Sequence, residues 1–186
     1  MTGVQTCALP IYASGDKSLH IYLSPQGSTF NHTLAAELAR KPRLALWCGR
    51  YEGIDQRFID EYIDAEISIG DFVLSGGEIA AAIVIDAVLR LVPGVLGDEQ
   101  SALEDSFQQK LLDHPHYTRP ENTATIRAPE ILLSGNHALI ERWRLKQALG
   151  RTFLHRPDIF CQLDLSDAQQ KLLNEFLTEQ QFGEPS

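Results

Sequence analysis

The sequence predicts an α/β fold built on a parallel sheet, followed by a small helical domain. In residues 19–96, short apolar runs of strand length alternate with helical patterns, which is typical of parallel strands covered by helices. A small, polar stretch at residues 97–104 interrupts this alternation. Beyond it, only helical patterns remain. We therefore interpret residues 97–104 as a linker between the two parts.

The first part contains three candidate strands and three candidate helices. The strands are expected at His20–Ser24, Leu44–Cys48 and Glu66–Leu74. The helices are expected at Thr29–Arg40, Asp55–Tyr62 and Glu78–Leu91. The last helix is apolar on nearly every side, which predicts that it is buried. Pro93 and Gly94 end it.

The second part, residues 105–186, contains three candidate helices. They are expected at Asp105–Asp113, His137–Leu149 and Asp167–Phe176. Asn136 is placed to cap the second helix, and Gly150 is placed to stop it.

The first eleven residues, MTGVQTCALPI, differ in style from the rest of the chain. They lack the basic start and long apolar core of a signal peptide. They resemble a translated sequencing adapter, so we expect residues 1–11 to be non-native and the authentic sequence to begin upstream of Tyr12. A short disordered terminus is the alternative. Residues 12–96 would then form the α/β domain.

Composition excludes several classes of protein. The 186 residues (20.8 kDa) are 44% hydrophobic and 22% charged, as in ordinary globular domains. No apolar run has the length of roughly 18 residues that a membrane span needs. Cys7, Cys48 and Cys161 are too few for a zinc-binding or disulfide framework, and their odd number fits a cytoplasmic protein. The net charge of −9 argues, taken globally, against binding to nucleic acid.

Each candidate strand leads into a turn that contains glycine. The turns are Ser24–Gly27, Cys48–Gly53 and Ile69–Asp71, the last of which continues to Ser75–Glu78. Ligands of open α/β sheets bind beyond the carboxyl ends of the strands, and glycine allows close approach to the backbone. The turns therefore suit an adenosine-like ligand, although such turns also need glycine for structural reasons. GxGxxG and GxxxxGK[ST] are absent from the sequence, so neither a Rossmann dinucleotide site nor a P-loop is indicated.

Two charged residues are candidates for catalysis. Arg90 follows Asp86 by four residues, which suits either a helical ion pair or a cation that faces a cleft. Asp105 opens the helix expected after the linker, where an acid can cap the helix, serve as a general base, or do both.

Cations gather in one stretch of the second part. Residues 142–156 contain five Lys or Arg residues and no acid, with Trp143, Phe153 and His155 between them. Cations contact phosphates and aromatic rings stack on unpaired bases, so the stretch suits RNA. A solvated helix face with Trp143 in the core is the alternative.

Eight motifs occur in order from about Leu19 to the C-terminus: YLSPQG, CGRYEGID, SIGDFVLSGGE, PGVLG, EDSF, LLDHPHYTRPE, LLSGNH and RWRLKQALGRT. Through them the chain closely resembles the bacterial tRNA (guanine-N1)-methyltransferase family, TrmD. The resemblance implies a SPOUT-type parallel sheet with a C-terminal trefoil knot, followed by a small helical domain. It also implies a homodimer that binds S-adenosylmethionine (SAM) at the knot and methylates tRNA.

The resemblance also implies roles for individual residues. Asp105 corresponds to the general base, and Arg90 to the arginine near the target guanine, which lies at position 37 of tRNA, 3′ of the anticodon. The resemblance implies that the helical part binds tRNA, and the cation-rich stretch offers Arg142, Arg144, Lys146 and Arg151 for this role. The positions expected to bind SAM are Tyr22, Leu23, Ser24, Pro25, Gln26, Gly27, Gly49, Tyr51, Glu52, Ile69, Gly70, Asp71, Phe72, Val73, Leu74, Gly76 and Gly77. The resemblance also implies that Mg²⁺ takes part in the reaction, but no set of metal ligands can be recognised in the sequence.

Three departures from the family pattern bear on activity. The family's N-terminal segment, with its PYGGG-type loop, is absent; Ile79-Ala80 follows SGGE where the family has Leu-Pro; and Phe72 replaces a tyrosine. The first departure leaves open a catalytically inactive fragment that binds SAM or RNA. A different SPOUT RNA methyltransferase, such as one acting on ribose 2′-OH, is a second alternative, against which Asp105, Arg90 and the helical C-terminal part argue.

Overall fold

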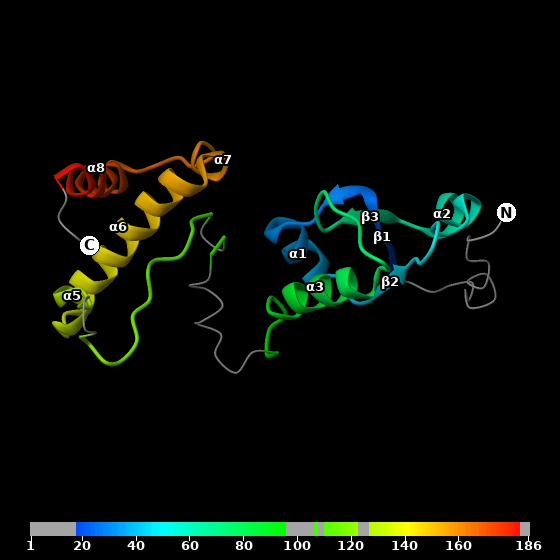
Figure 1. Ribbon diagram of the computed structural model, residues 1–186, viewed down its shortest axis with the longest axis horizontal. Helices are drawn as coiled ribbons and strands as arrows, with labels where there is room; N and C mark the ends of the chain where they lie inside the picture. Colours follow the sequence, from blue (N-terminus) through cyan, green and yellow to red (C-terminus); the bar gives the residue numbers. More distant parts are fainter. Residues whose placement is uncertain (1–17, 96–105, 108–109, 123–126, 183–186) are drawn as a thin grey trace. The chain divides into compact units, whose positions relative to one another are not determined.

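The computed structural model describes residues 18–95, 106–107, 110–122 and 127–182 (Figure 1). The chain divides into two compact units, Met1–Glu99 and Gln100–Ser186, and each is described by itself. The linker expected at residues 97–104 lies outside the described residues. Within the described part, no helix is long and apolar enough to cross a membrane.

The first unit contains a parallel sheet of three strands in the order β2-β1-β3 (Figure 1). The central strand β1 (Leu19–Thr29) pairs on one side with β2 (Leu44–Cys48) and on the other with β3 (Ala65–Ser68). This arrangement confirms the α/β class and the parallel sheet expected from the sequence. The trefoil knot remains a prediction from family resemblance.

Strand β1 is longer than expected because it contains a bulge. Leu23 and Ser28 are both in register with Ile67, so the four residues between them form a bulge without partners of their own in β3. Gly27 permits this path, since a Cβ atom there would lie 2.3 Å from the backbone of β3 at Ile67. The prediction that the strand ends at Ser24 is therefore wrong: the expected turn is a bulge within a continuous strand.

Three helices accompany the sheet: α1 (His32–Ala39), α2 (Gln56–Tyr62) and α3 (Glu78–Leu89). Side chains cap the first two, since Asn31 Oδ1 accepts from the Leu34 backbone N–H at 3.0 Å and Asp55 Oδ1 accepts from the Arg57 N–H at 2.9 Å. Helix α1 begins three residues later than expected because β1 runs on through Thr29. Strand β3 ends at Ser68, well before the expected Leu74.

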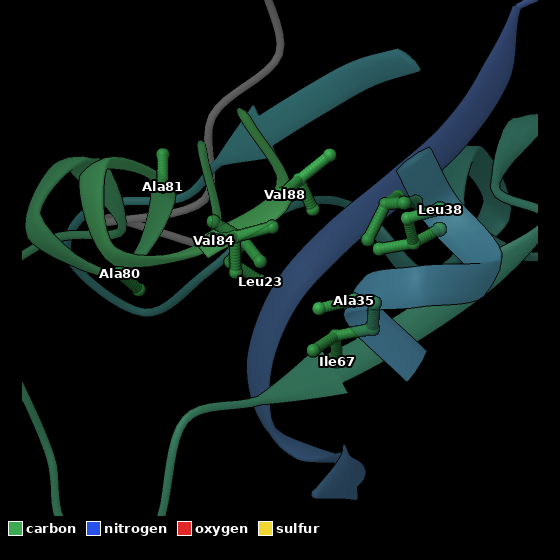
Figure 2. Close-up of a cluster of buried hydrophobic side chains, with 9 residues drawn as sticks. Leu23, Ala35, Leu38, Ile67, Ala80, Ala81, Val84 and Val88 are labelled. Atoms are coloured by element: carbon green, nitrogen blue, oxygen red, sulfur yellow. The ribbon is translucent and has the colours of Figure 1, made fainter. Parts of the chain in front are cut away.

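Helices α1 and α3 pack against the sheet to form the core of the first unit (Figure 2). Figure 2 shows the buried side chains of this cluster meeting between the two helices and the strands. Val84 and Ile21, from α3 and β1, are completely buried. The opposite face of α3 is different, because Ile79, Ile83 and Leu89 are about half exposed in the single chain. In the single chain, the prediction that this helix is buried on nearly every side is therefore wrong.

The second unit contains helices α5 (Glu130–Leu133), α6 (His137–His155), α7 (Pro157–Phe160) and α8 (Asp167–Phe182), with α8 packed along α6. Asn136 caps α6 as expected, its Oδ1 accepting from the Leu139 N–H at 3.3 Å. The prediction of a helix at Asp105–Asp113 is wrong for the residues described there. Phe107 and Lys110 have φ values of 76° and 57°, which a right-handed helix does not tolerate.

Helix α6 does not stop at Gly150, contrary to the prediction. It continues to His155, and Gly150 lies buried in its interior. A Cβ atom at this position would lie 2.1 Å from Cδ1 of Phe176, the buried aromatic ring of α8. The glycine therefore makes room for a ring from the neighbouring helix instead of ending its own.

We expect Gly150→Ala to lower the free energy of unfolding by about 1–3 kcal/mol, because overfilling a core costs this much. The clash with Phe176 should outweigh the better helix propensity of alanine. Urea denaturation of the variant measures the change. Adding Phe176→Leu to Gly150→Ala should recover part of the loss, with Phe176→Leu alone as the reference. A single variant as stable as the wild type would contradict this view of the α6–α8 contact.

Candidate functional site

A pocket of about 270 Å³ opens beyond the carboxyl ends of the strands in the first unit. The bulge of β1, the turn after β2 and the long turn between β3 and α3 all contribute to it. The structure thus brings together the three glycine-containing segments noted in the sequence, the first of them as a bulge and not as a turn. Of the positions expected to bind SAM, these line the pocket: Tyr22, Leu23, Ser24, Pro25, Gln26, Gly49, Tyr51, Glu52, Ile69, Gly70, Phe72, Val73, Leu74, Gly76 and Gly77.

Two expected positions are absent from the lining of this pocket. Gly27 lies against the backbone of β3, and the side chain of Asp71 is exposed. Sequence reasoning also missed several residues that do line it, namely Arg50, Gly53, Ile67, Ser68, Ser75 and Ala80. Of these, Arg50, Gly53 and Ser75 belong to turns already singled out. The position of Ser68 at the carboxyl end of β3 is the signal that would have identified it.

The second and third turns are held directly against each other. Arg50 and Gly76 form an isolated antiparallel bridge, and the Gly77 N–H donates to the Gly49 carbonyl at 3.1 Å. A Cβ atom on Gly77 would lie 2.9 Å from Cα of Cys48. This close approach of two backbones requires glycine, so the SGGE motif is needed to assemble the pocket wall.

An ion pair links the same two turns on the outside. Arg50 Nε donates to Glu78 Oε1 at 2.6 Å, and both side chains are about half exposed. The hydrogen bond from Arg50 lowers the pKa of Glu78 below its usual value. Exposed pairs of this kind add little stability, so its main effect is to orient the turn that begins α3.

Tyr22 is a buried residue of the pocket lining. Its hydroxyl lies 2.8 Å from the position that a Cβ atom of Gly49 would occupy, and 3.3 Å from that of Gly53. Burial is the main cause of a raised pKa for Tyr22, so the hydroxyl stays neutral near pH 7. The pKa of the Cys48 thiol is also raised, mainly by burial and further by the charge of Glu78. A raised pKa keeps the Cys48 thiol in its protonated, less reactive form near pH 7.

Exposed apolar side chains surround the pocket. Tyr51 and Val73 are each 85% exposed, and Phe72 is also exposed. Tyr51 further adopts a φ of 58°, a left-handed conformation that non-glycine residues rarely take. Strained backbone and exposed apolar groups around a pocket are typical of binding sites.

Arg90 lies at the far end of α3 from the pocket. It is the C-cap residue of that helix, its backbone N–H donates to the Asp86 carbonyl at 3.2 Å, and its side chain is exposed. Gly77, at the other end of α3, lines the pocket. At a rise of about 1.5 Å per residue, the two positions are roughly 20 Å apart along the helix. Asp105, the expected general base, lies outside the described residues.

Most of the Lys and Arg residues of α6 form ion pairs with acidic residues of their own unit. Arg142 pairs with Glu175 and Lys146 with Glu179, both across to α8 and at 2.6 Å. The Lys146 residue is only 8% exposed. Arg144 pairs with Glu141 one turn earlier, at 2.9 Å. Arg151 is exposed, and among the described residues no ion pair involving it is found.

Comparison with known proteins bears on what such a pocket serves. The profile of the tRNA (Guanine-1)-methyltransferase TrmD matches residues 4–162. The tRNA (guanine-N(1)-)-methyltransferase of Shewanella loihica is 58% identical over 172 residues, covering 92% of this chain and 69% of the relative. The enzyme of the same name from Chromobacterium violaceum is 56% identical over 168 residues. This match covers 90% of this chain and 66% of the relative.

This chain belongs to the TrmD family. It spans about two thirds of the length of these relatives. The TrmD match begins at residue 4, inside the segment 1–11 that we expected to be non-native, and that expectation remains a prediction. TrmD membership confirms the resemblance seen in the eight motifs and implies SAM as the methyl donor.

No group of three metal-ligating side chains is found among the described residues that line the TrmD pocket. Among the described residues, one group of three side chains that could hold a metal is found, formed by Asp113, His114 and His116 in the other unit. Mg²⁺ prefers an oxygen-rich octahedral shell, which two imidazoles do not supply. We therefore assign no step of the reaction to Mg²⁺.

Proposed function

We propose that this chain transfers the methyl group of SAM to N1 of the guanine at position 37 of tRNA. The convergence of three glycine-containing turns on one pocket, in a chain of the TrmD family, carries the proposal. SAM supplies an activated methyl group, and the protein supplies position and charge. Gly49 and Gly77 line the pocket in which SAM would bind, and Tyr22 offers a neutral hydroxyl there.

The chemistry of guanine explains the need for Asp105 and Arg90. N1 of guanine carries a proton and is a poor nucleophile. We assign Asp105 to accept that proton as the new N–CH₃ bond forms and the S–CH₃ bond breaks. Negative charge then develops toward O6 of guanine, where the guanidinium of Arg90 would stabilise it, as preorganised donors do at oxyanions.

A homodimer reconciles Arg90 with the pocket. Within one chain, α3 holds Arg90 roughly 20 Å from the pocket end of the helix. The outward face of α3 exposes Ile79, Ile83 and Leu89, an apolar surface suited to a second copy. If two α3 helices pack antiparallel about a two-fold axis, the Arg90 end of one approaches the Gly77 end of the other. Each active site would then combine the two subunits.

Ile83→Asp tests this arrangement. We expect the wild-type chain to sediment as a particle of twice 20.8 kDa and the variant to sediment as a monomer, because a charge on the apolar face of α3 disfavours its burial. Leu133→Asp, on the exposed part of α5, is the matched control and should remain a dimer. A dimeric Ile83→Asp chain would contradict the role of α3.

The methylated product distinguishes this function from its rivals. After incubation with SAM, an unmodified tRNA transcript would be digested to nucleosides and analysed by mass spectrometry. We expect 1-methylguanosine. A ribose-methylated nucleoside would instead indicate a different SPOUT methyltransferase. SAM binding without any methylated nucleoside would favour a catalytically inactive SAM- or RNA-binding chain.

We propose that the helical unit binds tRNA, with Arg151 as its clearest phosphate contact. Because Arg142 and Lys146 are engaged with α8, their replacement would also disturb the α6–α8 contact. Arg151→Ala should weaken tRNA binding and reduce the slope of log affinity against log salt concentration by about 1. Filter binding at several salt concentrations measures this slope. Lys171→Ala, an exposed cation on α8, is the control; equal slopes for both variants would refute a specific role for Arg151.

A further inference from the structure

Three side chains of kinds that bind metals meet in the second unit. Asp113 Oδ1 lies 2.8 Å from Nδ1 of His114, and Asp113 Oδ2 lies 2.8 Å from Nε2 of His116. The three ligand atoms are all within 4.8 Å of one another. The two imidazole rings lie side by side, with centroids 4.5 Å apart. One carboxylate and two imidazole nitrogens thus converge on one point.

The surrounding structure fixes this cluster on helix α6. The Leu112 N–H donates to Thr152 Oγ1 at 2.8 Å, which ties the segment to a buried residue of α6. The Asp113 N–H donates to Ser106 Oγ at 2.9 Å. The ring of His114 packs edge-on against Trp143, with centroids 6.5 Å apart. The ligands are therefore held before any ion arrives, which reduces the entropic cost of binding.

The three side chains differ in exposure in a way that suits a metal site. The His114 side chain is 11% exposed and that of Asp113 is 24% exposed, whereas the side chain of His116 is 71% exposed. Two ligands therefore sit in a partly desolvated position, while the third borders solvent and leaves a path for an ion. A water molecule can complete a four-coordinate shell from that side.

We propose that Asp113, His114 and His116 form a binding site for a divalent transition metal, with Zn²⁺ as the best match. Imidazole nitrogen and carboxylate oxygen are ordinary Zn²⁺ ligands, and Zn²⁺ accepts a tetrahedral shell of three such groups and water. Mg²⁺ and Ca²⁺ favour all-oxygen shells and are disfavoured by the two imidazole donors. A bound ion would cross-link Asp113, His114 and His116 and so stabilise the conformation of residues 111–117 against α6.

Calorimetric titration of Zn²⁺ into the metal-stripped 186-residue chain tests the site. We expect one ion per chain and a higher Tm in its presence, because a ligand that binds the folded state stabilises it. His116→Gln should weaken binding by at least about tenfold. Since His116 is exposed, the variant should fold normally, which circular dichroism verifies. His137→Gln, an exposed histidine at the start of α6, is the matched control and should bind as the wild type does.

Cobalt substitution separates this site from binding to cysteine. Co²⁺ bound by imidazole and carboxylate shows visible d–d bands without the strong near-ultraviolet absorption of a thiolate ligand. We expect the wild-type chain to show d–d bands without thiolate absorption. These bands should be lost in His114→Asn and His116→Gln. The proposal is overturned if Zn²⁺ does not bind, if His116→Gln binds it as tightly as His137→Gln, or if the cobalt spectrum shows thiolate ligation.

Discussion

Asp105→Ala is expected to reduce the rate of methyl transfer by about 10²–10⁴-fold, the usual contribution of a general base. SAM affinity should stay within a few-fold of the wild type, because the carboxylate acts on guanine N1 and not on the methyl donor. Single-turnover transfer of a labelled methyl group to tRNA measures the rate, and calorimetry measures SAM binding.

The neighbouring acid in the same EDSF motif provides the control. Glu104→Ala removes a carboxylate one residue earlier and should retain most of the activity. If Asp105→Ala turns over at nearly the wild-type rate, or if both variants lose activity equally, Asp105 is not the general base.

Gly27→Ala is expected to weaken SAM binding by up to about 100-fold and to lower the Tm by several degrees. A Cβ atom at this position would lie 2.3 Å from the Glu66 carbonyl carbon and from the Ile67 nitrogen. These are backbone atoms of β3 and cannot rotate away, so the bulge of β1 has to separate from β3. Overfilling of this kind costs about 1–3 kcal/mol, and each 1.4 kcal/mol transmitted to the pocket weakens binding tenfold.

Ser28→Ala is the matched control for this experiment. It changes the next residue of the same strand, whose side chain is exposed and makes only a 3.4 Å hydrogen bond to the Glu66 carbonyl. We expect it to keep both the wild-type Tm and the wild-type SAM affinity. A Gly27→Ala chain that retains both properties would show that the close approach of β1 and β3 is not needed for the pocket.

Local patterns predicted much of the first unit correctly. The apolar run LALWC became β2 with the expected ends, Leu44 and Cys48, and Asp55 caps α2 where the pattern placed the helix start. The convergence of the three turns also followed from a general rule, because carboxyl ends of parallel strands share one edge of a sheet. The pocket lining was therefore largely foreseeable from strand–turn order.

The errors occur where a residue's role depends on a distant part of the chain. Gly150 carries the local signature of a helix stop, but its space is filled by Phe176 from another helix. Gly27 resembles a turn glycine, but it lies against β3, whose pairing no local pattern reports. Likewise, the apolar face of α3 predicts burial without saying whether the same chain or a second copy covers it.

The pairing of Arg142 and Lys146 with α8 is a further effect of this kind. In sequence, residues 142–156 carry five cations and no acid, which favours a nucleic-acid surface. In the structure, Glu175 and Glu179 meet two of these cations from a helix more than thirty residues later. Charge counted along one segment overstates the free charge of the folded surface.

Methyl transfer from labelled SAM to a pair of tRNA transcripts tests the central claim most directly. One transcript carries guanine at position 37, and the other differs only in having adenine there. We predict label in the guanine transcript and none in the adenine transcript, since the proposed reaction removes a proton that guanine N1 carries and adenine N1 lacks. Equal incorporation into both transcripts, or none into either, would contradict the proposed activity of this chain.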